Sequence, residues 1–244
     1  MGSATRCVVT LCAALLGGAC ARRIETPPSP PTPQRSERAE ERQRLANLAA
    51  HSMTLYCDLL LEETVNQPRK VLELTENPEQ TYPGIEGATA YPFVFYQRLR
   101  AAYLICADEH GDLEQATKVL PVVEECWKKL KGAREFKYLA NACKMAALAH
   151  ATLARRLDKA RRGPEAAAVH DRGVDFYVEL LDTAPKQSLA TYRYVLYQLD
   201  KRVRERPNSA DRRKLLEVAR KAAALFGKEA KEADEILKRL APEP

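Results

Sequence analysis

The amino-acid sequence predicts an all-α fold, an array of antiparallel helical hairpins, and two observations carry this prediction. Apolar residues recur at steps of three and four along most of the chain, which is the spacing of one face of an α-helix. Alanine, leucine and charged residues dominate the composition, whereas runs of β-branched residues, which strands favour, are scarce. The 244 residues, 45% of them hydrophobic, suffice for one helical domain with a sizeable core, which we assign to residues 37–244.

Residues 91–132 carry the clearest hairpin pattern. Pro92 can begin the first helix without losing an intrahelical hydrogen bond, Gly111 ends it, and Asp112 caps the second. The apolar positions are Phe95, Leu99, Tyr103 and Cys106 in the first helix and Leu113, Ala116, Leu120, Val123 and Trp127 in the second. Pro121 interrupts this spacing and predicts a kink or a new helix start at that point.

This hairpin resembles the tetratricopeptide repeat, in which a glycine marks the turn and a small alanine lets two helices approach closely. The residues that carry the resemblance are Tyr103, Ala107, Gly111, Ala116 and Leu120. A second partial match consists of Gly173, Tyr177 and Pro185. The resemblance implies a stacked α-solenoid of the tetratricopeptide kind, and an irregular helical bundle is the alternative.

Further helices are predicted on both sides of the hairpin. On the C-terminal side they cover residues 136–161, 164–184, 189–204, 210–226 and 228–240. On the N-terminal side a helix begins at residue 36, and a short one covers residues 68–75. The first of these has a stripe made of Leu45, Leu48, Ser52, Leu55, Leu59 and Glu62. Residues 76–91 contain prolines and glycines and predict a long loop.

The first 20 residues predict export from the cytoplasm. Arg6 precedes an apolar run over residues 8–19, which is too short to cross a membrane as a helix but has the length of a signal-peptide core. The run ends Gly18-Ala19-Cys20, which resembles the lipobox of bacterial lipoproteins, with Cys20 as the acylated residue. Ala21 after the cysteine implies the outer membrane. The alternatives are an ordinary signal peptide cut after Ala21 and a cytosolic chain with a hydrophobic start.

Residues 21–36 are rich in proline and predict an extended tether behind the anchor. The prolines are Pro27, Pro28, Pro30, Pro31 and Pro33. A segment this rich in proline has no packed structure available, and its residues 24–36, extended by ~3.1 Å each, reach on the order of 40 Å. A spacer of this length separates a lipid anchor from a folded domain.

Four cysteines remain in the predicted domain: Cys57, Cys106, Cys126 and Cys143. An even count in an exported chain permits disulfides, and Cys126 with Cys143 is the candidate pair. Because each cysteine lies beside an apolar stripe, buried free thiols are the alternative interpretation. No spacing typical of metal ligands occurs, and the sequence predicts neither a metal nor a cofactor.

The sequence contains no catalytic motif, and we expect a non-enzymatic protein. His150 lies on an apolar stripe and is expected to be a core histidine with one backbone partner. Basic residues concentrate between Lys201 and Lys221, with acidic residues interspersed. This region predicts a solvated, charge-balanced surface, and a contact with anionic lipid or an acidic partner is the alternative.

Together these patterns predict a lipid-anchored periplasmic scaffold or assembly factor that binds an envelope protein, because stacked hairpins create extended surfaces. The expected partner contacts are Tyr82, Tyr91, Phe93 and Tyr96, since aromatic side chains are enriched in binding hot spots. The alternative is an envelope enzyme or thiol-redox protein with an unrecognised helical site. Export would exclude nucleic acid as a partner.

Overall fold

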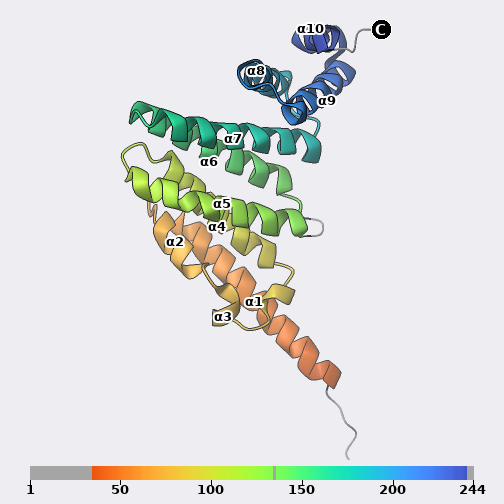
Figure 1. Ribbon diagram of the computed structural model, residues 1–244. Helices are drawn as coiled ribbons and strands as arrows, with labels where there is room; N and C mark the ends of the chain where they lie inside the picture. Colours follow the sequence, from red (N-terminus) through yellow and green to blue (C-terminus); the bar gives the residue numbers. More distant parts are fainter. Residues whose placement is uncertain (1–34, 134–135, 241–244) are drawn as a thin grey trace, which may run out of the picture. The chain divides into compact units, whose positions relative to one another are not determined.

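The computed structural model describes residues 35–133 and 136–240, and over these residues the chain is helical without a strand (Figure 1). The α-helices are α1 (Arg35–Leu60), α2 (Pro68–Leu74), α3 (Pro78–Thr81), α4 (Tyr91–Ala107), α5 (Leu113–Gly132), α6 (Leu139–Lys159), α7 (Gly163–Thr183), α8 (Leu189–Glu205), α9 (Ser209–Phe226) and α10 (Lys231–Leu240). Two 3₁₀ helices, η1 (Ile85–Gly87) and η2 (Gly227–Glu229), complete them. The predicted all-α fold is confirmed. The chain divides into two units, Met1–Ala39 and Glu40–Pro244, and all packing described below lies within the second.

Two hydrophobic cores share helix α7 as a common wall. The first core joins α4, α5, α6 and α7 and contains Leu99, Trp127, Leu153, Leu157 and Phe176. The second joins α7, α8, α9 and α10 and contains Leu181, Tyr192, Leu196, Leu199 and Leu215. Helix α7 therefore turns Phe176 and Leu180 to one core and Val174 and Leu181 to the other. Helix α7 thus has two apolar faces, and other helices of the same chain bury both of them.

Small residues bring α6 and α7 close together. A Cβ atom added at Gly173 would lie 3.1 Å from the Cβ of His150 and 3.5 Å from the carbonyl oxygen of Ala147. Helix α6 is rich in short buried side chains, namely Ala142, Ala146, Ala147, Ala149 and Ala154. Because these side chains are short, the two backbones pack tightly over most of the hairpin.

Three buried arginines connect consecutive hairpins. Arg98 of α4 donates to the carbonyl oxygen of Leu72 at 2.7 Å, near the end of α2. Arg156 of α6 donates to the carbonyl oxygens of Cys106 at 3.1 Å, in the last turn of α4, and of Gly111 at 2.7 Å, in the turn that follows it. The carbonyls of a final helical turn lack intrahelical partners, so each arginine satisfies acceptors that would otherwise be unpaired. The third, Arg202, belongs to the site described below.

Helix α1 differs from the prediction in the face that it buries. Its inner face consists of Ala50, Cys57 and Leu60, with Met53 beside them. The predicted stripe lies on the outside instead, and its leucines are exposed by 58% at Leu45, 60% at Leu48, 52% at Leu55 and 55% at Leu59. Both faces repeat at steps of three and four, so the sequence could not show which of them the chain covers.

Two local predictions need correction. Pro121 does not begin a new helix, because α5 continues through it from Leu113 to Gly132, and a kink at this point stays a prediction. The region predicted as a loop contains α3 and η1, joined through Gly84 in the left-handed conformation at φ 89°. Ile85 is fully buried there against Ala50 of α1, which gives this short segment a small core of its own.

Candidate functional site

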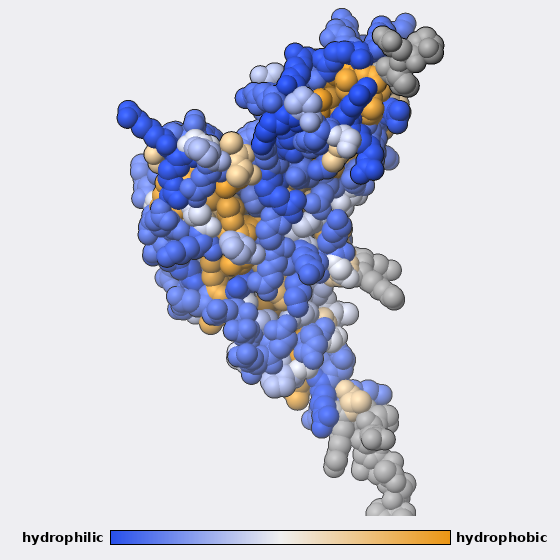
Figure 2. All heavy atoms as spheres, viewed as in Figure 1, coloured by the Kyte–Doolittle hydropathy of each residue, from blue (hydrophilic) through white to orange (hydrophobic). Residues whose placement is uncertain are grey.

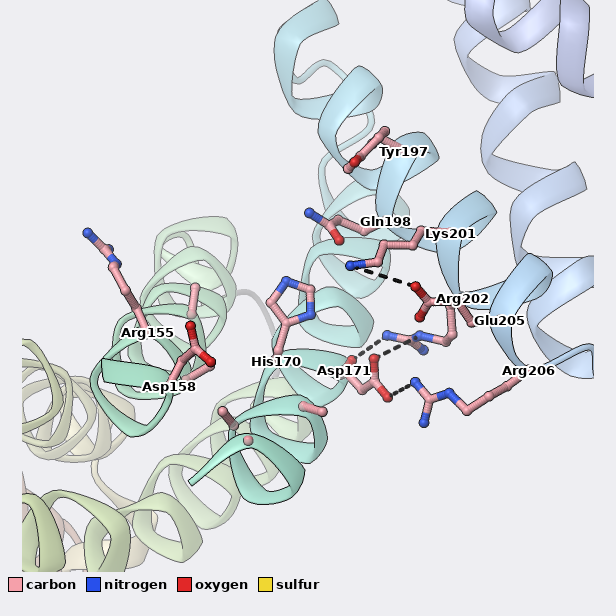
Figure 3. A pocket seen from close by; sticks show the side chains of 15 residues that line it. Arg155, Asp158, His170, Asp171, Tyr197, Gln198, Lys201, Arg202, Glu205 and Arg206 are labelled. Carbon is pink, nitrogen blue, oxygen red and sulfur yellow. Dashed lines mark hydrogen bonds and ion pairs between the residues drawn. The ribbon is translucent and has the colours of Figure 1, made fainter. Parts of the chain in front are cut away.

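A groove between α6, α7 and α8 is the candidate site (Figure 3). Its cavity volume is about 430 Å³. Alanines form its floor: Ala151 and Ala154 come from α6, and Ala166 and Ala167 from the start of α7. The hollow exists because these side chains are too short to fill the space between the helices. Polar side chains from all three helices stand around this floor.

Arg202 fixes the α8 side of the groove. Its guanidinium lies 3.3 Å from the carboxylate of Asp171, 3.1 Å from that of Asp175 and 3.4 Å from that of Asp211. It also donates to the carbonyl oxygen of Asp171 at 2.6 Å. The side chain is 8% exposed, so its charge is buried with three compensating carboxylates from α7 and α9. Removing one partner of such a cluster leaves an unpaired buried charge, and Arg202 therefore locks α8 to α7 and α9.

Five further polar side chains in the groove make no hydrogen bond or ion pair with another described residue. Arg155 and Asp158 project from α6, His170 from α7, and Tyr197 and Gln198 from α8 (Figure 3). Tyr197 is 67% exposed, which is unusual for a large aromatic side chain. Burial lowers the pKa of His170, and the charges of Arg202 and Lys201 add to this while Asp171 opposes it. The neutral form of His170 is therefore favoured, and a neutral imidazole can both donate and accept a hydrogen bond.

The groove can accordingly bind a ligand that has both charges and hydrogen-bonding groups. Arg155 offers a cation and Asp158 an anion on one wall, and Tyr197 offers a flat apolar surface with a hydroxyl on the other. Tyrosine and arginine are the residue types enriched in binding hot spots. Sequence reasoning missed this site, because its residues are scattered over three helices and follow no motif.

A second, larger hollow of about 770 Å³ lies between α2 and the end of α4. Leu104 and Ile105 line it beside Lys70, Glu73 and Asp112. Most of its polar groups belong to chain turns and helix ends. Its polar side chains come mainly from the short helix α2 and the residues just before it, whereas those of the groove come from three long helices and surround an exposed tyrosine, so the groove remains the stronger candidate.

Three of the aromatic residues predicted to contact a partner, Tyr91, Phe93 and Tyr96, lie in the first two turns of α4, and the fourth, Tyr82, lies between α3 and η1. Phe93 and Tyr96 are half-buried and stack on Phe136, with ring centroids 5.2 and 5.8 Å away. Tyr91 packs edge-on against Phe95 at 5.0 Å, and its hydroxyl donates to Glu79. Tyr82 is 43% exposed. The structure therefore brings Phe93 and Tyr96 together and gives them a packing role, and their contact with a partner stays a prediction.

The four cysteines of the described region are free, buried thiols, including Cys126 and Cys143. The Cys143 thiol donates to the carbonyl oxygen of Phe176 at 3.2 Å. Burial raises the pKa of Cys57 to about 11 and that of Cys106, Cys126 and Cys143 to about 12. A reactive cysteine needs the opposite, an exposed thiol with a lowered pKa, so this arrangement does not favour thiol-redox chemistry.

His150 is a core residue, as predicted, and belongs to an ionic network. It is 2% exposed and its Nδ1 lies 2.9 Å from the carbonyl oxygen of Ala146. Its Nε2 lies 3.5 Å from Glu124, and Arg172 binds the same carboxylate through two hydrogen bonds of 2.6 Å. Burial alone would raise the pKa of Glu124, but hydrogen bonds from Arg172 and His150 lower it to about 2. Each charged group has a partner, so the network fastens α5 to α6 and α7.

The basic segment from Lys201 to Lys221 is largely neutralised. Arg204 pairs with Asp200 at 2.6 Å, Lys214 with Asp175 at 2.9 Å, and Lys221 with Asp182 at 2.5 Å. Figure 2 shows hydrophilic residues over most of the visible surface, with apolar residues in patches between them. The predicted charge-balanced surface is confirmed for these pairs.

Several features of the sequence prediction fall outside the described residues. These are Cys20, the signal peptide over residues 1–20 and the tether predicted over residues 21–36, except for Arg35 and Ser36, which begin α1 instead. Within the described part, no group of three or more His, Cys, Asp and Glu residues could hold a metal ion. No helix there combines the length and the apolar character that a membrane span requires.

The comparisons with known proteins give no relative of this chain. No family model matches it, and neither the curated proteins nor the solved structures contain a match.

Proposed function

We propose that the protein is a lipid-anchored, non-enzymatic scaffold of the bacterial cell envelope, facing the periplasm, that binds a protein partner in the groove between α6, α7 and α8. The observation that carries the proposal is the set of uncompensated polar groups around Tyr197, with Arg155 and Asp158 opposite. A peptide segment with its own charges and backbone groups is the ligand that such a mixed lining complements. A helical hairpin array presents such grooves on rigid elements.

The anchor is the part of the proposal that rests on the sequence. The short apolar run, the Gly18-Ala19-Cys20 ending and the proline-rich segment after it support acylation at Cys20. Metabolic labelling with a fatty acid tests it. The wild type should carry the label and Cys20→Ser should not, and equal labelling of the two chains would remove the anchor from the proposal.

Site-specific photo-cross-linking tests the groove. A photoreactive phenylalanine analogue at position 197 should cross-link one envelope protein of defined size when the full chain is expressed in bacteria. The same analogue at Leu225, which is 47% exposed but lies outside the groove, is the matched control. Arg155→Glu should then weaken the cross-link from position 197 at least several-fold. Identical products from both positions, or no effect of Arg155→Glu, would contradict binding in the groove.

A further inference from the structure

The outer face of α1 is an apolar surface that the described chain leaves uncovered. It consists of Leu45, Leu48, Leu55, Tyr56 and Leu59, each at least 45% exposed. Scattered exposed leucines are ordinary on protein surfaces, but five large apolar side chains on one face of one helix form a contiguous patch, and such patches mark interaction sites. We call this set, with Ser52 among them, the outer seam.

The spacing of the outer seam identifies the kind of element that fits it. Leu45, Leu48, Ser52, Leu55 and Leu59 follow steps of three, four, three and four. This seven-residue repeat is the a and d pattern by which one α-helix packs along another. The inner face of α1 lies roughly 150° around the helix and is already covered by α2, η1 and α4. The outer seam is therefore a second helix-packing face rather than the edge of the first.

Charges beside the outer seam identify the partner and its direction. Arg44 precedes Leu45 and Asp58 precedes Leu59, so the two charges lie on the same edge, one near each end. In an antiparallel pair this edge meets the same edge of a second copy. Arg44 of each copy then lies against Asp58 of the other, which gives two equivalent ion pairs. In a parallel pair it would meet the other edge, where Ala49 and Tyr56 offer no charge. Asp58 also binds Arg100 at 2.5 Å, but its side chain is 53% exposed and remains accessible.

We infer that the protein self-associates through an antiparallel pair of α1 helices, with the outer seams of two copies packed together. The centre of the seam lies at Ser52, whose small side chain allows the helices to approach there. Leu45 of one copy then lies near Leu59 of the other. The inference does not depend on the proposed groove, which lies on α6, α7 and α8.

Cysteine cross-linking of the full chain, purified in mild detergent, tests the pairing. Ser52→Cys should give a disulfide-linked dimer on mild oxidation, because residue 52 of each copy lies beside the two-fold axis. The wild type measures the background from its own cysteines. Leu225→Cys, an exposed position outside the seam, measures random collision. A Ser52→Cys dimer no more abundant than in these two controls would overturn the inference, whatever else covers the seam.

A mixing experiment tests the direction of the helices. Leu45→Cys and Leu59→Cys lie about 21 Å apart along α1, so neither chain alone should cross-link in an antiparallel pair. Equal mixing of the two chains should give the disulfide-linked dimer. Cross-linking of Leu45→Cys with itself would show a parallel pair and contradict the charge argument. Adding Leu48→Asp and Leu55→Asp to Ser52→Cys should lower the dimer at least tenfold, and an undiminished dimer would also overturn the inference.

Discussion

Helices α1 and α7 are both long, both have two apolar faces, and differ in how many of those faces the chain covers. Helix α7 turns Phe176 to the first core and Leu181 to the second, and both side chains are fully buried. Helix α1 buries Cys57 and Leu60 but leaves Leu48 and Leu59 exposed. The comparison teaches that apolar periodicity predicts the number of packing faces on a helix, whereas tertiary structure decides which faces are filled.

The largest expected effect concerns the buried charge that holds α7 against the second core. Arg202→Met leaves Asp171, Asp175 and Asp211 without their common cation, and should cost about 3–5 kcal/mol of unfolding free energy. Arg204→Met is the matched control, because Arg204 is 66% exposed and pairs only with Asp200. It should cost less than about 1 kcal/mol. Urea denaturation of both variants measures the difference, and equal losses would show that Arg202 is not a structural tie.

Truncating one leucine on each helix compares the faces directly. Leu181→Ala removes a fully buried side chain of α7 and should cost about 2–5 kcal/mol. Leu48→Ala on α1 should change the stability of the monomer by no more than about 0.5 kcal/mol. Denaturation at low protein concentration measures both values. A large loss for Leu48→Ala in the monomer would mean that the outer seam packs within its own chain.

The sequence predicted much of the fold because helix signals are local. The hairpin around Gly111, the cap at Asp112 and the core position of His150 all follow from neighbouring residues, and the structure has them in place. The new helix start predicted at Pro121 is wrong for a local reason too, since α5 continues through a proline that lies at an exposed helix position. The groove depends on which helices lie side by side, and no local pattern contains that information.

A smaller effect is expected where α6 and α7 touch. Gly173→Ala places a methyl group 3.1 Å from the Cβ of His150, so the helices must separate slightly, at a cost of about 1–3 kcal/mol. Gly132→Ala is the control, because no atom lies within 4 Å of the added Cβ. It should be neutral or stabilising by up to ~1 kcal/mol, since alanine favours the helix. If both variants have the same melting temperature, the close approach of α6 and α7 at Gly173 does not require a glycine.

The smallest expected effect is the pH dependence that Glu124 contributes between α5 and α7. Its pKa is lowered from 4.5 to about 2, so the ionised form is favoured in the folded protein. The stabilisation is therefore fully present above about pH 4.5 and is lost as the pH falls toward 2. Glu124→Gln should lose less stability than the wild type between pH 6 and pH 3, as measured by urea midpoints. If the urea midpoints of wild type and variant fall in parallel with pH, Glu124 does not stabilise the folded protein through its ionised form.

The dependence of the melting temperature on protein concentration tests the comparison of α1 with α7 most directly. Association of folded chains stabilises them by mass action, so the wild-type melting temperature should rise with concentration. Leu48→Asp with Leu55→Asp should abolish this rise and leave the melting temperature at low concentration unchanged. Leu181→Ala should melt lower at every concentration and keep the rise. A wild-type melting temperature independent of concentration, or a double variant already destabilised as a dilute monomer, would contradict the account of α1 as a helix whose outer face is completed by a second copy.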